Sequence, residues 1–280
     1  MGLIDFILNV AGLLLWLNWR SLGISSRGRS PGVSLLATLQ RAERPGTRRW
    51  VSLAGLLALL LVRSVVYWQL GPTEPWSPSL NLGAISLTFR SDYAGRMLVY
   101  SLLSFGQLLL TFYLWLLLLA MVNRSVSDSD PIQRQIRLHL GPLASWPATL
   151  QVLVPFVGAV LLWAVSNPVL VRLGITPHPQ YTGHLWQQAL VLASGVYLAW
   201  EFLLVGLLFL HLINSYVYLG NWAFWNFINA TARNLLVPLR LLPLQLGRFD
   251  GAPLCGMALV LLTSEFGAQG LALLYQRLPL

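Results

Sequence analysis

The sequence predicts an all-α fold, a polytopic membrane helix bundle of about six transmembrane helices with two interfacial loop helices. The chain is 56% hydrophobic and only 10% charged, whereas soluble domains carry roughly a quarter charged residues. Six apolar stretches approach or reach the roughly 20 residues that a helix needs to cross a bilayer. In addition, a period of 96 residues relates the third and fourth stretches to the fifth and sixth.

The six stretches are separated by segments of 13 to 39 residues. They cover residues 2–19, 50–70, 97–122, 149–171, 185–213 and 253–276. The third is the strongest prediction, because it has eleven leucines and no charge. The first resembles a signal peptide in its position, but no basic residue precedes its apolar run and no small-x-small cleavage pattern follows it. We therefore expect a retained helix.

The arginines indicate how these helices are oriented. Thirteen of the 18 fall in the segments 20–49, 123–148 and 214–252, whereas four fall in the alternate segments and Arg63 lies inside a span. The positive-inside rule then places the thirteen in the cytoplasm and both termini outside, in the plasma (inner) membrane. Because the arginines lie in short segments between apolar runs, we attribute the net charge of +9 to topology rather than to nucleic-acid binding.

The repeat divides the chain into three parts. Two N-terminal helices with an Arg-rich loop occupy residues 1–96, a first and degenerate copy occupies 97–184, and a second copy occupies 185–280. The spacing is clearest in the connecting loops, where four residues of the first copy recur 96 positions later. These pairs are Arg137 and Arg233, Pro142 and Pro238, Leu143 and Leu239, and Pro147 and Pro243.

Each connecting loop is expected to contain a short amphipathic helix. In the first loop Asp130 suits the N-cap, Pro131 the first helical position and Gly141 the exit. Two opposed faces are expected in each copy: Gln133, Arg134 and Arg137 against Ile132, Ile136 and Leu140, and Asn226, Asn229 and Arg233 against Phe227, Leu235 and Val237. Such a helix either lies in the headgroup plane or packs on its own bundle.

The second loop carries the most specific motif in the chain. It runs NLLVPLRLLPLQLGRFDGAPL from Asn234 to Leu254. The motif positions in and just before it are Arg233, Pro238, Leu239, Arg240, Pro243, Gly247, Asp250 and Pro253. This pattern resembles the signature of the YggT family of small membrane proteins, although Ala252 and Leu241 replace residues that are frequent in the family. In the first copy Ala144 stands where Arg240 would be.

The resemblance implies a non-enzymatic role. YggT-like proteins are linked to membrane organisation, tolerance of osmotic stress and, in a plastid relative, assembly of a haem-bearing cytochrome. We therefore expect an assembly factor, scaffold or accessory subunit whose partners are the lipid bilayer and other membrane proteins. Independently of the family, two prolines five positions apart interrupt the helix, and Arg240 and Asp250 are placed to pair across the turn. The simpler alternative is a motif that only turns the chain.

Four ionisable residues lie inside the predicted spans, where charge is costly and each is a functional hypothesis: Arg63, Glu201, His211 and Glu265. Arg63 and Glu265 lie about 20 and 18 Å from the cytoplasmic ends of their spans at 1.5 Å per residue, so they could form an ion pair. Together with Glu201 they define the alternative function, a small ion or proton transporter. We favour the structural explanation, in which these residues form a structural pair, snorkel to the interface or make a subunit contact.

Enzymatic and cofactor chemistry are not expected. The sequence has no phosphate-binding glycine loop, zinc spacing or nucleophile elbow. A bis-histidine haem needs ligands on facing helices, and only His211 lies in a span.

Overall fold

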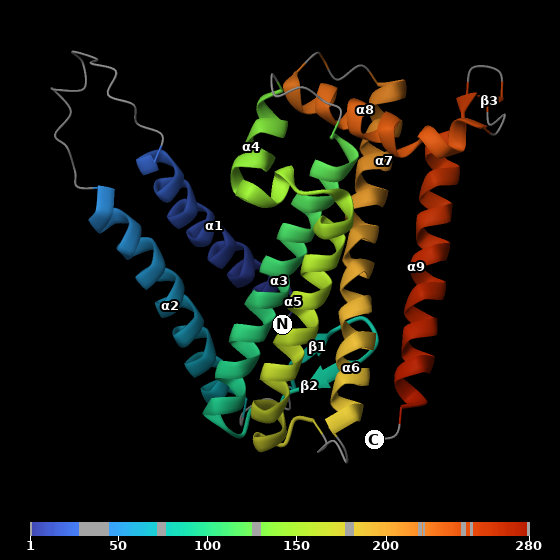
Figure 1. Cartoon of the computed structure of the whole chain (residues 1–280). Helices are drawn as coiled ribbons and strands as arrows, with labels where there is room; N and C mark the ends of the chain where they lie inside the picture. Colours follow the sequence, from blue (N-terminus) through green and yellow to red (C-terminus); the bar gives the residue numbers. More distant parts are fainter. Residues whose placement is uncertain are drawn as a thin grey trace, which may run out of the picture. The chain divides into compact units, whose positions relative to one another are not determined.

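The computed structural model of this protein describes residues 2–27, 45–71, 77–124, 130–176, 182–217, 220, 222–241, 245–246 and 249–278. The elements in these ranges are nine α-helices, three 3₁₀ turns and four very short strands. Figure 1 shows their arrangement. The chain is an all-α helical membrane bundle, as predicted.

Six segments are long and apolar enough to cross a membrane, which confirms the predicted number. The single-helix spans are α1 (Gly2–Arg27), α2 (Pro45–Leu70), α3 (Ala94–Val122), α5 (Ala148–Arg172) and α9 (Ala252–Gln276). The fifth span in the chain is built from α6 (Thr182–Gly195), the 3₁₀ turn η3 (Val196–Ala199) and α7 (Trp200–Tyr216).

The η3 turn divides a stretch that the sequence presented as one continuous helix. Gly195, just before the turn, touches the backbone of the loop at Leu82, since a Cβ on Gly195 would lie 3.1 Å from that carbonyl oxygen. The turn also changes the backbone hydrogen-bond pattern, and the indole N–H of Trp115 donates to the carbonyl of Ala199 at 2.7 Å. In the same region the indole N–H of Trp200 donates to the carbonyl of Leu114 at 3.2 Å. Buried backbone acceptors are thereby satisfied without water.

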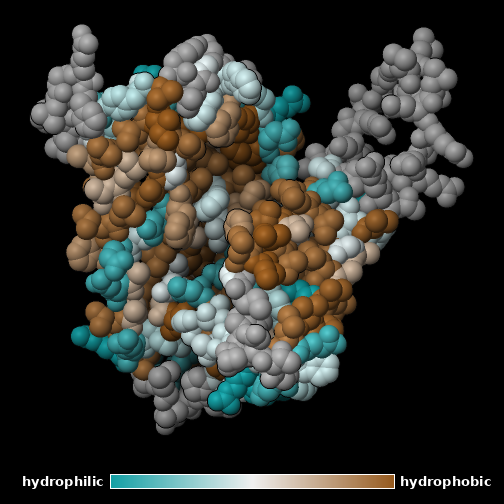
Figure 2. Space-filling view, turned by 180° about the vertical axis from the view of Figure 1, so that it is seen from behind, coloured by the Kyte–Doolittle hydropathy of each residue, from teal (hydrophilic) through white to brown (hydrophobic). Residues whose placement is uncertain are grey.

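Large apolar side chains are exposed along the spans. Val165 on α5 and Phe202 on α7 are 74% and 72% exposed. Figure 2 shows hydrophobic residues, in brown, gathered over the helices on one face. A helix that exposes apolar side chains along its length is expected in a bilayer, because contact of these side chains with lipid acyl chains has no hydrophobic cost.

The chain comprises two compact units. Unit 1 contains residues 1–80 and 88–110, and unit 2 contains 81–87 and 111–280, so that α3 contributes its first part to unit 1 and its second part to unit 2. The first unit packs α1 along α2, with a core of Leu56, Leu60 and Phe105. Gly12 lets α1 approach Phe105 on α3 closely, because a Cβ at Gly12 would lie 2.9 Å from that ring.

In unit 2, short helices follow the long ones in the same order twice. Helix α4 (Pro131–Leu140) is followed by the 3₁₀ turn η2 (Gly141–Ser145), and helix α8 (Ala223–Leu235) by η4 (Val237–Leu241). The two 3₁₀ turns lie 96 residues apart, at the period read from the sequence. Helices α4 and α8 contact each other and share a core with α3 that contains Leu117, Ile136 and Phe227.

The predicted ends of α4 are confirmed. The Asp130 side chain accepts hydrogen bonds from the amides of Ile132 and Gln133, with Pro131 in the first turn. Gly141 ends the helix at φ 61°, a backbone conformation that an L side chain rarely adopts.

The predicted faces of the loop helices need two corrections. Gln133 was placed on the polar face with the arginines, but it is fully buried with Ile136 and Leu140. The spacing of these three residues puts them on one helical face. The amide nitrogen of Gln133 donates to the backbone carbonyl of Asn123, whereas its Oε1 has no hydrogen-bond partner among the described residues. Val237 was placed on the apolar face of the second helix, but it is exposed and lies in η4, where the helical period no longer applies.

Four short strands were not predicted. Strands β1 (Ser79–Asn81) and β2 (Ser86–Thr88) form one two-stranded sheet in the segment that joins α2 to α3. Strands β3 (Gln245–Leu246) and β4 (Phe249–Asp250) pair antiparallel in the motif loop, with Gln245 opposite Asp250. They are two or three residues long, too short for an alternating pattern to be visible in the sequence.

Candidate functional site

The most elaborate polar site of the described residues surrounds Arg63, on α2 in unit 1. Its side chain is almost completely buried and lies near three helices. Nη2 lies 2.7 Å from Oδ1 of Asp5 on α1, and Nη1 donates to Oδ1 of Asn9 at 2.7 Å. Nη2 also donates to the hydroxyl of Ser104 on α3 at 3.1 Å. We call Asp5, Asn9, Arg63, Tyr67, Tyr100 and Ser104 the arginine cluster.

Two tyrosines complete the coordination of Asp5. The hydroxyl of Tyr67 donates to Oδ1 of Asp5 at 2.5 Å, and that of Tyr100 donates to Oδ2 at 3.2 Å. Both rings also lie near the guanidinium, with Cζ of Arg63 5.4 Å from the Tyr67 centroid and 5.3 Å from that of Tyr100. The carboxylate thus receives three donors, and the cation lies within the range of cation–π attraction to two rings.

The electrostatics explain why these groups occur together. An unpaired charge in a span is costly, and a buried ion pair is tolerated only when its remaining donors and acceptors are satisfied. Here the amide of Asn9 accepts from Arg63 and donates to Ser104 at 2.9 Å, which links the first helix to the third. Within the Arg63 guanidinium, Nε is the nitrogen that has no hydrogen-bond partner among the described residues.

The arginine cluster is therefore suited to fixing helix positions. It contains one base, one acid and four neutral hydrogen-bonding groups, and each helix of unit 1 contributes to it. No group of three or more His, Cys, Asp or Glu that could hold a metal ion occurs among the described residues.

The sequence identified Arg63 but not its partner. The predicted pairing with Glu265 is wrong about the carboxylate: Arg63 pairs with Asp5, while Glu265 accepts from Gln269 one turn away at 2.8 Å. Matching depths could not distinguish between acids, since Asp5 lies in the first turn of α1 and its depth depends on packing. The sequence signal for Asp5 is that it is the first charge of the chain and falls within an apolar stretch.

The other predicted ionisable residues each have a polar neighbour in unit 2. The hydroxyl of Ser264 on α9 donates to Oε2 of Glu201 on α7 at 2.5 Å. Nδ1 of His211 lies 2.8 Å from Oδ1 of Asn229, which joins α7 to α8. Glu265 is exposed. The structure thus places Glu201 next to Ser264, which precedes Glu265 in the chain. His211 has a different partner, Asn229.

The structure describes only some of the residues of the YggT-like motif. Pro243 and Gly247 lie outside the described residues, and so does the side chain of Arg240, so the predicted pairing with Asp250 falls outside them too. The Asp250 side chain accepts from the Ala252 amide at 3.0 Å, at the start of α9. Pro253 is buried in the first turn of that helix. Arg233 on α8 and Pro238 on η4 are exposed, and Leu239 packs against the core around Leu208 and Leu236.

A second polar cluster, in unit 2, was missed by the sequence reasoning. Asn123, Gln133 and Thr231 are each fully buried. The amide of Asn123 donates to the Thr231 hydroxyl at 2.7 Å, and the amide of Asn234 donates to Oδ1 of Asn123 at 3.1 Å. Gln133 donates to the Asn123 carbonyl at 3.3 Å. These bonds tie α4 and α8 to the end of α3, and the available sequence signal is the polar residue that ends the third apolar stretch.

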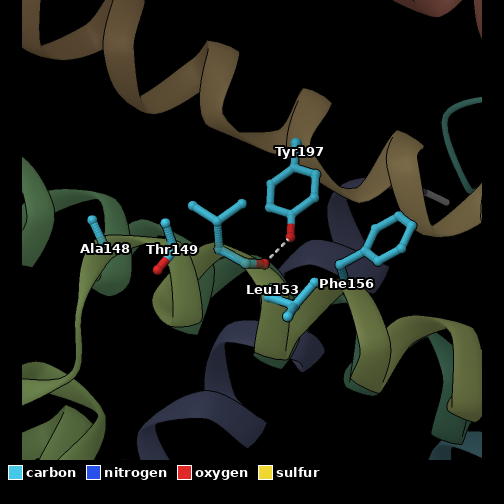
Figure 3. A pocket seen from close by; sticks show the side chains of 6 residues that line it. Ala148, Thr149, Leu153, Phe156 and Tyr197 are labelled. Carbon is cyan, nitrogen blue, oxygen red and sulfur yellow. Dashed lines mark hydrogen bonds between the residues drawn. The ribbon is translucent and has the colours of Figure 1, made fainter.

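An apolar pocket lies between α5 and η3 in unit 2. It has a volume of about 580 Å³ and is lined by Ala148, Thr149, Val152, Leu153, Phe156 and Tyr197. Figure 3 shows Tyr197 pointing toward α5, where its hydroxyl donates to the carbonyl of Val152. Because that hydrogen bond satisfies the hydroxyl, the pocket offers mainly apolar contact.

Comparison of the chain with protein-family models, with curated proteins and with solved structures gives no match.

Proposed function

We propose that this protein is a non-enzymatic, YggT-like membrane protein that acts as an assembly factor, scaffold or accessory subunit in membrane organisation or stress tolerance. The proposal places it in the plasma (inner) membrane, with both termini outside and the loops that contain α4 and α8 in the cytoplasm. The Arg-rich segments of the sequence support this orientation. The partners are other membrane proteins and the surrounding lipid.

The observation that carries the proposal is the fixed pair of loop helices. Buried hydrogen bonds between Asn123, Gln133 and Thr231 hold α4 and α8 against α3. Both helices lie at the same end of unit 2 (Figure 1). A surface whose backbone is already ordered loses little conformational entropy when a partner binds.

The exposed residues of this surface are suited to protein contacts. Arg134 and Arg233 are exposed, one from each helix. Trp222 and Phe224, at the start of α8, are 75% and 50% exposed. Arginine and aromatic side chains are enriched at protein interfaces, so the combination favours a docking platform over a free loop.

The arginine cluster supports the same role. Arg63 is held by fixed partners on neighbouring helices, which suits a framework more than a moving charge. In a scaffold, this ion pair would keep α1 and α2 in place while the loop helices engage the partner.

The test is affinity purification of the chain from native membranes in mild detergent, read by mass spectrometry. The Arg240→Ala, Asp250→Ala double variant is compared with wild type, and Asp92→Ala, Arg96→Ala serves as a matched control that removes an exposed pair outside the motif. We expect a stoichiometric partner that the motif variant loses and the control retains. A chain that purifies alone in all three samples would contradict the proposal.

A second candidate is a small ion or proton transporter. The supporting observation is the acidic site at mid-span in unit 2, where Glu201 accepts from Ser264 next to Glu265. This function requires that purified protein in sealed vesicles carry a proton or cation flux that Glu201→Gln abolishes. Such a flux would replace the scaffold proposal.

A further inference from the structure

Helix α9 has an exposed polar stripe in the middle of a membrane span. Its buried residues are Ala252, Pro253 and Gly256, all in the first turns. Further along, one helical face is exposed at successive positions three or four residues apart. These positions are Ala258, Leu262, Glu265, Gln269, Leu273 and Gln276. We call them the α9 stripe.

Glu265 is the unusual member of the stripe. It lies about 20 Å along a helix of 25 residues, at 1.5 Å per residue, and so near the middle of the span. Its Oε1 accepts from Nε2 of Gln269, a neutral donor, and no basic side chain lies within 4.0 Å of it among the described residues. A carboxylate in this position is rarely left facing lipid, because intramembrane charges almost always face protein or a water-filled cavity.

The neighbourhood adds no positive charge. Ser264 uses its hydroxyl for Glu201, so the nearest ionisable group tied to this part of α9 is a second acid. The α9 stripe therefore combines a carboxyl group that has no basic partner among the described residues with apolar flanks at Leu262 and Leu273. The complementary surface is a transmembrane helix with one cation at mid-depth.

A second copy of this chain does not supply that cation. Arg63 is buried, forms an ion pair with Asp5 and donates a hydrogen bond to Asn9. His211 is within hydrogen-bond distance of Asn229. A symmetric contact along α9 would also bring two Glu265 carboxylates together, which disfavours their charged forms.

We propose that the α9 stripe binds a transmembrane helix of another membrane protein, and that a Lys or Arg of this partner pairs with Glu265 at mid-membrane. The inference rests on the proposed scaffold function and identifies the membrane-embedded part of its partner surface. The backbone permits close approach, since a Cβ built on Gly270 meets no atom within 4 Å. Small residues of this kind let two membrane helices pack tightly.

The experiment is site-specific photocrosslinking in native membranes. A photoreactive residue replaces Leu262, which is 58% exposed on the α9 stripe, or Leu161 on α5, a matched control that is 53% exposed. We expect position 262, but not 161, to crosslink to one protein at a transmembrane segment that contains Lys or Arg. Glu265→Gln keeps the side-chain shape and should reduce this crosslink about tenfold. Glu265→Lys, combined with the partner's base changed to Glu, should restore it.

The outcomes separate this inference from the scaffold proposal. A partner that copurifies in a motif-dependent way but gives no crosslink at position 262 would overturn the role of the α9 stripe and leave the scaffold intact. Crosslinks only to a second copy of this chain, or a crosslink unchanged in Glu265→Gln, would also overturn it. Absence of any partner in both experiments would remove both proposals.

Discussion

Nη2 of Arg63 lies 2.7 Å from Oδ1 of Asp5, and this ion pair joins residues 58 positions apart on two antiparallel spans. The arginine side chain is 1% exposed and the aspartate 16% exposed, so water screens the pair little. Each charge offsets the cost of burying the other. The pair therefore explains why a helix with an arginine at position 63 is compatible with a membrane bundle.

Removal of one partner should be far more damaging than removal of both. Asp5→Ala leaves a buried cation unpaired and should lower the free energy of unfolding by about 3–5 kcal/mol, whereas the apolar pair Asp5→Leu, Arg63→Leu should recover much of this loss. Asp92→Ala is the control, because its pair with Arg96 is exposed and should be worth at most about 1 kcal/mol. Unfolding of the purified protein in mixed detergent micelles measures all three. Equal losses for Asp5→Ala and Asp92→Ala would contradict the buried pair.

The buried hydroxyl of Thr231 should contribute measurably to the position of α8. Thr231→Val keeps the shape but removes the acceptor for the Asn123 amide, and we expect a loss of about 1–3 kcal/mol in the same unfolding measurement. Thr263→Val is the matched control, since that hydroxyl is exposed and bonds only to carbonyls of its own helix. Its effect should stay within about 0.5 kcal/mol.

Two glycine substitutions should have opposite signs. Gly141 has φ 61° at the end of α4, so Gly141→Ala strains the backbone and should lower the unfolding free energy by about 1–3 kcal/mol, although nothing lies within 4 Å of the new Cβ. Gly158 is inside α5 and also has open space around it. Gly158→Ala should therefore stabilise by about 0.5–1 kcal/mol. Thermal unfolding followed by helical circular dichroism distinguishes the two, and a stabilising Gly141→Ala would refute the strained cap.

The N-cap of α4 should control how often its first turn opens. Asp130→Ala removes the acceptor for the amides of Ile132 and Gln133, and it should speed their hydrogen exchange about fivefold, equivalent to about 1 kcal/mol. Asp130→Asn keeps an acceptor oxygen and should leave exchange close to wild type. If both variants exchange alike, the side-chain cap is not what orders this turn.

The membrane class, the number of spans and the loop helix ends were predictable from local sequence. Hydropathy over 18 or more residues determines insertion whatever the tertiary contacts, so the predicted stretches agree closely with the helices. Asp130, Pro131 and Gly141 act within one turn of their own positions, and for this reason their roles could be read directly. The 3₁₀ turn η3 could not be predicted, because the glycine before it contacts a loop more than 100 residues earlier in the chain.

The sequence by itself determined that Arg63, Glu201, His211 and Glu265 lie inside spans, because membership of an apolar stretch is a local property. Which groups they contact was decided only by tertiary structure: Asp5 for Arg63, Ser264 for Glu201, Asn229 for His211. The physical reason is that a side-chain partner depends on the rotation and depth of two helices together, and hydropathy constrains neither. The same reason applies to Gln133, whose buried amide donates to the backbone carbonyl of Asn123 in the turn after α3.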